Sequence, residues 1–241
     1  MFSNWLERTE LLLGNEKVKK LNKSHILVVG VGGVGAYAAE QLCRAGVGEL
    51  TIVDGDKIDI TNINRQLIAD TESIGKVKVN ILRERLLKIN PKLKINSIYK
   101  YIKEEEITKL LSNKYDYVID AIDTLSPKIN FIKTALENKQ RLISSMGAGA
   151  KLNPELIQIA DISKSFNDNL ARILRKRLHR LGIYNGFNVV FSSEKVIKEA
   201  IRETEFIENK KSTVGTISYM PPIFGLYIAS KVIRDLIEWK N

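Results

Sequence analysis

A glycine-rich run between two apolar segments constrains the fold of this chain more than any other feature. The apolar segment at 25–29 leads directly into Gly30-Val31-Gly32-Gly33-Val34-Gly35. A helical pattern follows at 36–45, and a second apolar run at 50–53 ends at Asp54. This order of strand, glycine turn, helix, strand and acid is typical of a nucleotide-binding βαβ unit. Glycines let the backbone approach a phosphate closely, and the helix N-terminus offers unpaired N–H groups.

The glycine run by itself does not choose between a dinucleotide cofactor, ATP and a turn that serves only packing. Asp54 stands at the tip of the second predicted strand, where a carboxylate can accept hydrogen bonds from ribose hydroxyls. We therefore expect Asp54 to contact the nucleotide, and the alternative is that it caps the following loop.

Strands and helices alternate through the first 150 residues, which predicts an α/β fold with a Rossmann-like, doubly wound, mostly parallel sheet. Gly14 divides an amphipathic helical segment at 4–22. After the glycine unit, strands are predicted at 94–99, 115–121 and 141–146, and helices at 76–89, 104–112 and 127–138.

Beyond residue 150 the pattern changes to a C-terminal extension of mixed strands and helices. Strands are predicted at 156–160 and 188–191, a basic helix at 170–181, and an apolar-striped core helix at 223–239. The charged segment 194–213 is predicted to be a loop with a short helix. We expect one domain over 1–241, divided into a helical segment at 1–24, a nucleotide-binding core at 25–150 and an extension at 151–241.

The composition of the chain limits the classes of partner and the cellular locations that we expect for it. The 38 Lys and Arg residues exceed the 28 Asp and Glu residues, which gives a net charge of +10. Such an excess favours a polyanionic partner such as nucleic acid, and the alternative is a lysine-rich composition spread evenly over the surface. No apolar run approaches the roughly 20 residues of a membrane span, and no signal-peptide pattern is present, so we expect a cytoplasmic protein without membrane insertion.

The single cysteine, Cys43, excludes an intramolecular disulfide and a cysteine-based zinc site. Its position within the first predicted helix of the glycine unit favours a buried packing role over a catalytic one.

Two cations and an acid downstream of the glycine turn favour ATP over NAD. Arg65 can bring a forked guanidinium to phosphate oxygens, and Lys78 adds a second cation. Asp123 follows a predicted strand, and its carboxylate can hold Mg²⁺ beside phosphate oxygens. The alternatives are a surface ion pair for Arg65, Lys76 in place of Lys78, and a helix cap at Asp123.

Taken together, these motifs resemble the ubiquitin-activating-type adenylating superfamily, whose bacterial members include the ThiF- and MoeB-like adenylyltransferases. The resemblance implies a homodimer in which Arg8 reaches the ATP site of the neighbouring subunit. It also implies that Asp54 binds ribose, that Asp123 assists Mg²⁺, and that the remaining ATP contacts come from Gly30, Gly32, Gly33, Gly35, Asp56, Asn62, Arg65, Gln66 and Lys78.

Longer stretches are most similar to the tRNA threonylcarbamoyladenosine dehydratase branch of this superfamily. They lie at 8–14, 61–66, 120–124, 145–150 and 221–226. The resemblance implies ATP-dependent cyclisation, through an acyl adenylate, of the threonylcarbamoyl group on an adenosine beside the tRNA anticodon. An intramolecular nucleophile has a high effective concentration and needs no enzyme thiol, which agrees with a chain that has one cysteine.

Three other functions stay open from the sequence. One is adenylation of the C-terminus of a ubiquitin-like sulfur-carrier protein, although many such enzymes carry paired Cys-x-x-Cys motifs that this chain lacks. The second is an NAD-dependent oxidoreductase, and the third is a non-catalytic nucleotide-binding module that docks RNA. Sulfur-transfer proteins are a further expected partner in some organisms.

The basic helix is a candidate contact for tRNA phosphates, and the alternative is an ordinary solvated helix face. Its candidate residues are Arg172, Arg175, Lys176, Arg177 and Arg180.

Overall fold

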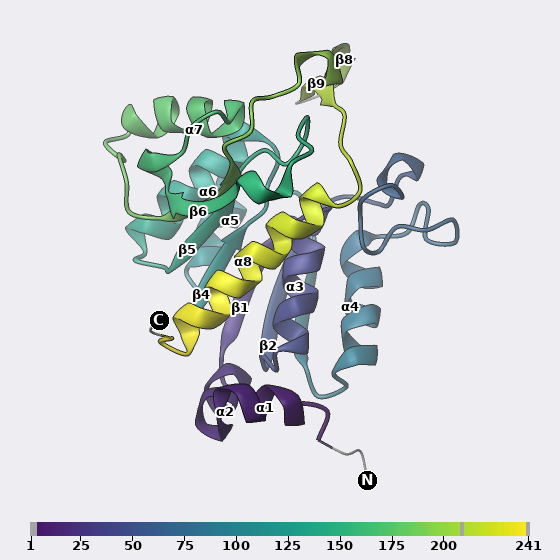
Figure 1. The fold of residues 1–241 in the computed structure, drawn as a ribbon, viewed down its shortest axis with the longest axis vertical. Coiled ribbons are helices and arrows are strands. Elements are labelled where there is room, and N and C mark those ends of the chain that lie inside the picture. Colours follow the sequence, from purple (N-terminus) through teal and green to yellow (C-terminus); the bar gives the residue numbers. More distant parts are fainter. Residues whose placement is uncertain (1–3, 208–209, 240–241) are drawn as a thin grey trace.

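A seven-stranded sheet forms the centre of the computed structural model, which describes residues 4–207 and 210–239 (Figure 1). The strands lie in the order β3-β2-β1-β4-β5-β7-β6, and every neighbouring pair is parallel except β6 with β7. Their bounds are β1 His25–Val29, β2 Glu49–Asp54, β3 Lys94–Tyr99, β4 Tyr117–Asp120, β5 Leu142–Ser145, β6 Ile157–Asp161 and β7 Asn188–Ser192.

Helices cover both faces of this sheet. One face packs against α3 Gly35–Arg44, α4 Lys78–Ile89 and α8 Met220–Leu236, and the other against α5 Glu104–Leu111, α6 Leu125–Glu137 and α7 Asn169–His179. Two short helices, α1 Glu7–Leu13 and α2 Asn15–Asn22, lie at one end of the sheet (Figure 1). None of the helices within the described ranges is long and apolar enough to cross a bilayer.

The side chains of β1 show why the sheet needs helices on both faces. Ile26 and Val28 belong to the core on the α3 side, whereas Leu27 and Val29 belong to the core on the α6 side. All four are buried, so the strand is apolar without alternation, as is typical of parallel sheets. The strand order reverses between β1 and β4, which makes the carboxyl ends of these two strands the expected ligand crevice.

The predicted α/β architecture with a mostly parallel sheet is confirmed. The extension is more closely joined to the core than its mixed pattern indicated, because β7 and β6 continue the same sheet beyond β5. The prediction of a loop with a short helix at 194–213 was largely wrong. A single 3-10 turn at Lys198–Ala200 precedes an antiparallel hairpin of β8 Ile201–Ile207 and β9 Lys210–Val214, which pair only with each other.

The glycine turn, residues 30–35, is packed too tightly for side chains at several positions. Gly30 has a φ of +85°, and a Cβ there would lie 2.6 Å from the carbonyl oxygen of Ala121. A Cβ at Gly35 would lie 1.8 Å from the carbonyl oxygen of Gly30. The start of α8 packs on the same turn, since a Cβ at Gly225 would lie 2.5 Å from the carbonyl oxygen of Val34.

We expect Gly30→Ala to lower the free energy of unfolding by about 2–4 kcal/mol, because it combines a left-handed backbone with a clash against the β4 exit. Gly75→Ala is the matched control, since Gly75 has a φ of +80° but a Cβ there would have nothing within 4 Å. The control should lose only about 1 kcal/mol. Urea unfolding of both variants measures the difference, and equal losses would contradict the close approach at Gly30.

Candidate functional site

The glycine turn presents unpaired backbone donors at the start of α3. The amide N–H groups of Gly32, Gly33 and Val34 find no acceptor in the described part of the chain. The positive end of the α3 dipole adds to these donors. The turn therefore has the properties of a phosphate-binding helix N-terminus.

Asp54 connects the glycine turn to the end of β2. Its Oδ2 accepts a hydrogen bond from the Val31 N–H at 2.7 Å, and its Oδ1 accepts one from the Asp56 N–H at 2.8 Å. Burial raises the pKa of this carboxyl, and nearby Lys78 opposes that effect. Each oxygen retains a lone pair, so Asp54 can still accept a ribose hydroxyl.

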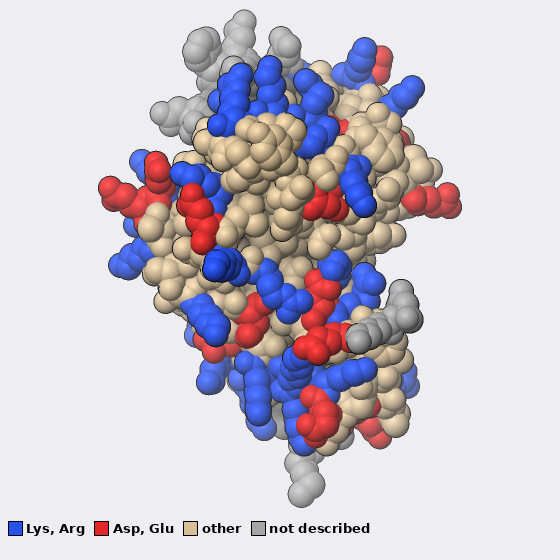
Figure 2. Space-filling model, turned by 90° about the vertical axis from the view of Figure 1, so that its left-hand side faces the viewer, with Lys and Arg blue, Asp and Glu red and all other residues tan. Residues whose placement is uncertain are grey.

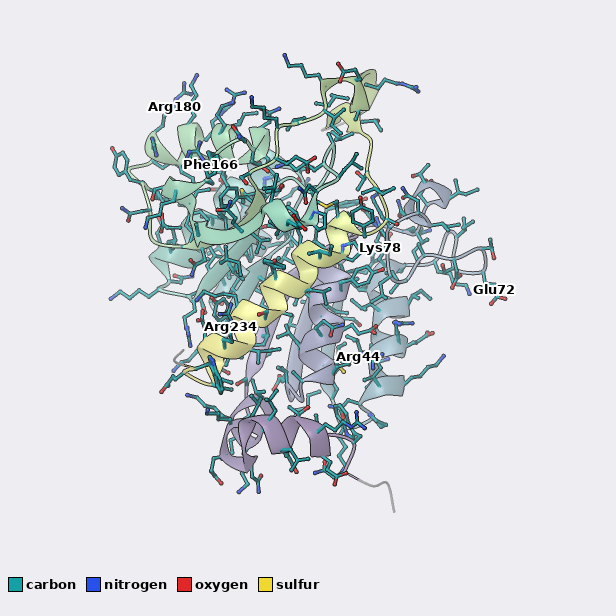
Figure 3. All side chains as sticks on the ribbon, in the orientation of Figure 1. Arg44, Glu72, Lys78, Phe166, Arg180 and Arg234 are labelled. Carbon is teal, nitrogen blue, oxygen red and sulfur yellow. The ribbon has the colours of Figure 1, made fainter. Side chains whose placement is uncertain are left out.

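Asp56 binds a lysine and a tyrosine side chain at the carboxyl-terminal edge of the sheet. Lys78 Nζ lies 2.7 Å from Asp56 Oδ2, and the Tyr101 hydroxyl donates to Asp56 Oδ1 at 2.7 Å. This hydrogen bond to a carboxylate raises the pKa of Tyr101 to about 12. Lys78 begins α4 with its side chain only 5% exposed (labelled in Figure 3). A ligand phosphate at this edge of the sheet would compete with Asp56 for the Lys78 ammonium group.

Tyr101 was not predicted from the sequence. Its ring covers Gly55, where a Cβ would lie 2.5 Å from the ring carbon Cγ. The sequence did contain one indication of its role, because Tyr101 follows β3 by two residues and therefore lies at the edge where all the parallel strands end.

The segment after β2 carries the other predicted phosphate contacts. Asn62 is buried and accepts a hydrogen bond from the Asp59 N–H, so its oxygen serves a local cap. Arg65 donates to the Thr61 carbonyl and to Asn64, each at 2.8 Å, and makes no ion pair with any described residue. The described residues therefore give no support to the surface ion-pair alternative for Arg65.

Gln66 is buried near the glycine turn with its Oε1 lacking a hydrogen-bond partner among the described residues. A Cβ at Gly32 would lie 3.6 Å from the Gln66 amide nitrogen. A buried acceptor without a donor is costly, and a bound ligand would remove that cost.

A buried ion pair supports the loop that leaves β4. Asp120 Oδ2 lies 2.8 Å from Lys128 Nζ and accepts the Ser144 hydroxyl at 2.6 Å, and both charged side chains are 0% exposed. Lys128 also donates to the Ile122 carbonyl at 3.0 Å, which fixes the backbone immediately before Asp123.

Asp123 itself is exposed beyond this loop. The cap position of α6 falls on Thr124, one residue after Asp123, and the Thr124 side chain makes no capping hydrogen bond. Among the described residues no group of three or more His, Cys, Asp or Glu side chains could hold a metal. A single carboxylate that binds Mg²⁺ together with phosphate oxygens and water is nevertheless an ordinary arrangement for this ion.

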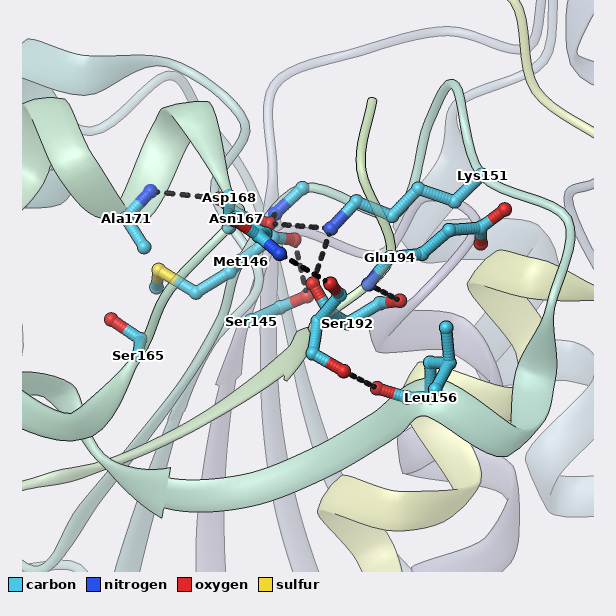
Figure 4. Close-up of polar contacts among 12 residues, drawn as sticks. Ser145, Met146, Lys151, Leu156, Ser165, Asn167, Asp168, Ala171, Ser192 and Glu194 are labelled. Atoms are coloured by element: carbon cyan, nitrogen blue, oxygen red, sulfur yellow. Dashed lines mark hydrogen bonds and ion pairs between the residues drawn. The ribbon is translucent and has the colours of Figure 1, made fainter. Parts of the chain in front are cut away.

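A second buried ion pair joins the extension to the end of β5 (Figure 4). Lys151 Nζ lies 3.3 Å from Asp168 Oδ2 and donates to the Ser192 carbonyl at 2.6 Å. Asp168 also accepts from the Gly147 N–H and caps α7 through the Ala171 N–H. The pair thus fixes the N-terminus of α7 against the carboxyl end of the sheet.

The basic helix α7 presents most of its predicted residues to solvent. Arg172, Lys176, Arg177 and Arg180 are exposed, and Figure 2 shows Lys and Arg side chains gathered at the upper end of the face over α7. Arg180 points outward at the end of the helix (Figure 3). Arg175 differs, because its guanidinium donates to the backbone and hydroxyl oxygens of Ser165.

Two further predicted residues lie away from the glycine turn. Arg8 is exposed on α1, at the opposite end of the sheet, so one subunit does not bring it to the site (Figure 1). Cys43 is fully buried, and burial raises the pKa of its thiol to about 11. A buried thiol of this kind is unreactive at neutral pH, as the packing interpretation requires.

Comparison with known proteins gives matches over the whole chain. A family model described as the ThiF family matches residues 6–241. A Bacillus subtilis protein named tRNA threonylcarbamoyladenosine dehydratase is 40% identical over 238 residues, which cover 96% of this chain and 94% of that protein. The crystal structure of E. coli tRNA N6-threonylcarbamoyladenosine dehydratase in complex with ATP has a TM-score of 0.89 at 31% identity, covering 99% of this chain and 97% of that chain.

A protein of the alternative type matches less of the chain. An Aspergillus niger protein named adenylyltransferase and sulfurtransferase is 35% identical over 133 residues, or 55% of this chain and 27% of that protein.

We expect Lys128→Ala to lower the free energy of unfolding by about 3–5 kcal/mol, because it leaves the Asp120 carboxylate buried without its cation. Lys133→Ala, on the same helix, is the matched control. Lys133 pairs with Glu137 at 3.8 Å and is 43% exposed, so its loss should cost about 0.5 kcal/mol or less. Urea unfolding at pH 7 checks both values, and a small loss at Lys128 would show that the buried pair is dispensable.

Proposed function

Since this chain belongs to the ThiF family, we propose that it is an ATP-dependent tRNA threonylcarbamoyladenosine dehydratase. The observation that carries this proposal is the phosphate-binding glycine turn beside the buried cation Lys78. Near-complete matches to proteins named for this activity support it.

In the proposed reaction, the threonyl carboxylate attacks the α-phosphorus of ATP, and the bond to the departing pyrophosphate breaks. The resulting acyl adenylate has AMP as its leaving group. A nucleophile within the same modified nucleoside then attacks the activated carbonyl, expels AMP and closes the ring. The nucleoside loses one water overall, and no enzyme thiol takes part.

The residues of this chain bind and orient the reactants. The N–H groups of the glycine turn and the cations Lys78 and Arg65 stabilise the negative charge that develops on the phosphates. Asp54 accepts the ribose hydroxyls, with Asp56, Asn62 and Gln66 lining the same pocket. Asp123 would hold Mg²⁺, which when bound neutralises phosphate charge.

The extension supplies the RNA side of the proposal. Helix α7 packs on the face of the sheet opposite α3, with its N-terminus fixed at the carboxyl end of β5, and its exposed cations Arg172, Lys176, Arg177 and Arg180 would contact tRNA phosphates. Arg175 is set aside from this group because Ser165 already binds its guanidinium. In this division, residues 25–150 bind the nucleotide and 151–241 face the RNA, and the site of action is the cytoplasm.

Adenylation of a sulfur-carrier protein is the less favoured function. Many enzymes of that type carry paired Cys-x-x-Cys motifs and often a sulfur-handling cysteine, whereas this chain has only Cys43, whose thiol is buried with a pKa of about 11. The matching protein of that type also covers only 55% of this chain.

Incubation with α-labelled ATP and Mg²⁺ tests the proposal. We expect AMP only in the presence of tRNA that carries threonylcarbamoyladenosine, together with the loss of one water from that nucleoside. Lys78→Ala should lower the rate of AMP formation by about 10²–10³-fold, because it removes a buried phosphate-binding cation. Lys76→Ala, an exposed neighbour, is the control and should stay within about twofold of the original rate.

AMP formation without any change in the mass of the nucleoside would contradict the dehydratase proposal. In that case, carrier-protein tails become the adenylation substrate to test.

A homodimer is part of the proposal because α1 has an exposed apolar surface that no other described residue covers. Helix α1 has no buried residue, and Leu11 and Leu12 are 82% and 75% exposed. A second subunit packed on α1 would cover these side chains and bring Arg8 to its ATP site.

Mixing two inactive variants tests this arrangement. In the proposed dimer, each ATP site contains Lys78 of its own subunit and Arg8 of the other subunit. Arg8→Ala and Lys78→Ala therefore each remove one of these two residues. In a symmetric dimer, random exchange should restore about a quarter of the sites, because half of the dimers are mixed and each mixed dimer has one intact site. Failure of the mixture to regain AMP formation after subunit exchange would place Arg8 outside the partner's site.

A further inference from the structure

A basic pocket opens at the amino-terminal edge of the sheet, opposite the glycine turn. It has a volume of about 460 Å³ and is lined by residues that immediately precede three parallel strands. Ser24 precedes β1, Asp116 precedes β4 and Arg141 precedes β5. Because parallel strands share one direction, this pocket and the nucleotide site lie at opposite edges of the sheet.

The charge of the pocket is mainly positive. The lining contains two acids, Asp116 and Glu238, and five cations: Lys20, Lys23, Lys114, Lys139 and Arg141. Both acids already have partners, since Asp116 accepts the His25 N–H at 2.8 Å and Glu238 lies 2.7 Å from Lys20 Nζ.

Three of the lysines make no close contact with an acid, although the charge of Lys23 also acts on Glu16 from a distance. Lys23, Lys114 and Lys139 form no ion pair and no side-chain hydrogen bond with any residue that the structure describes. All three are exposed. Clustered ammonium groups repel one another, and a bound anion would relieve that repulsion.

The backbone at Lys139 adds a second, independent observation. Lys139 follows α6 with a φ of +53°, a left-handed conformation that glycine or asparagine adopts at lower cost. The chain therefore places a lysine in the pocket at a position where glycine would stabilise the fold.

We infer that this pocket binds backbone phosphates of the tRNA substrate, away from the reacting base. Lysine ammonium groups are mobile point charges, which suit phosphodiesters and carry no base specificity. The identity of the RNA rests on the proposed function.

The pocket lies where a single long polyanion could contact both the pocket and α7. Helix α7 and the C-terminal end of α8, which borders the pocket through Leu236, lie on the same side of the molecule in Figure 1. That side faces the viewer in Figure 2, where the lower half carries both Lys or Arg and acidic side chains. The five or six residues of a strand separate the two edges by roughly 17–20 Å. An RNA no longer than the anticodon loop would fill the active site, and a full tRNA would extend to the pocket.

The test is the salt dependence of tRNA binding by the triple variant Lys23→Gln, Lys114→Gln, Lys139→Gly. Each phosphate contact contributes about 0.7–0.9 to the slope of log K against log salt. We expect the slope to fall by about 2 and the dissociation constant at low salt to rise about tenfold or more. The kcat, the KM for ATP and the affinity for a single-stranded RNA of the anticodon-loop sequence should not change. Lys139→Gly relaxes a left-handed residue, so the variant should remain folded in urea unfolding.

A second triple variant controls for the loss of three charges. Arg83→Gln, Lys88→Gln and Lys92→Gln remove three exposed cations on or just after α4, which make no ion pair with described residues. The control should keep the original slope. An unchanged slope in the pocket variant would overturn the inference, and this is the result expected if the pocket binds a free phosphate compound instead of tRNA. An equal loss of slope in the control variant would also overturn it.

The two proposals fail separately. If the pocket variant has a reduced salt slope for tRNA binding but the original protein does not dehydrate the nucleoside, the pocket proposal stands and the dehydratase proposal fails. If the protein dehydrates the nucleoside but the pocket variant keeps the original slope, the dehydratase proposal stands and the pocket proposal fails.

Discussion

The carboxylate of Asp54 is the interaction on which the nucleotide site depends. One oxygen binds the N–H of Val31 in the glycine turn, and the other binds the N–H of Asp56 just beyond β2. The first bond fixes the turn, and the second fixes the residue that holds Lys78 and Tyr101. A single, partly buried acid thus positions both the backbone donors of the glycine turn and the residue that holds Lys78. Its raised pKa is the electrostatic consequence of that burial.

The sheet gives the molecule two chemically different ends. At the carboxyl ends of the strands, buried pairs such as Asp120 with Lys128 and Asp168 with Lys151 compensate one another and fix loop geometry. At the amino ends, exposed lysines remain without partners among the described residues. Side chains held in fixed positions are suited to recognising one small ligand, whereas exposed lysines with mobile side chains are suited to binding a long polyanion.

Local patterns predicted much of the fold, and long-range packing accounts for most of what was not predicted. The strand at 94–99 and the glycine unit were confirmed because their residue patterns are contained in short segments. The hairpin of β8 and β9 was not predicted, because among the described residues these two strands form a sheet separate from the central one. Lys128, Lys151 and Tyr101 were also not predicted, because their partners depend on which distant strands become neighbours. The roles of Arg65, Lys78 and Asp123 stay predictions.

The packing of α8 on the glycine turn has a consequence for biosynthesis. Pro221 and Gly225 contact the turn that begins α3, although about three quarters of the chain separates the two segments. The ribosome makes the glycine turn early, but the helix that covers it emerges only after the extension has been translated. The contacts between α8 and the glycine turn can therefore form only after residues 151–219 have also been synthesised, so the packing around the turn is completed late in translation.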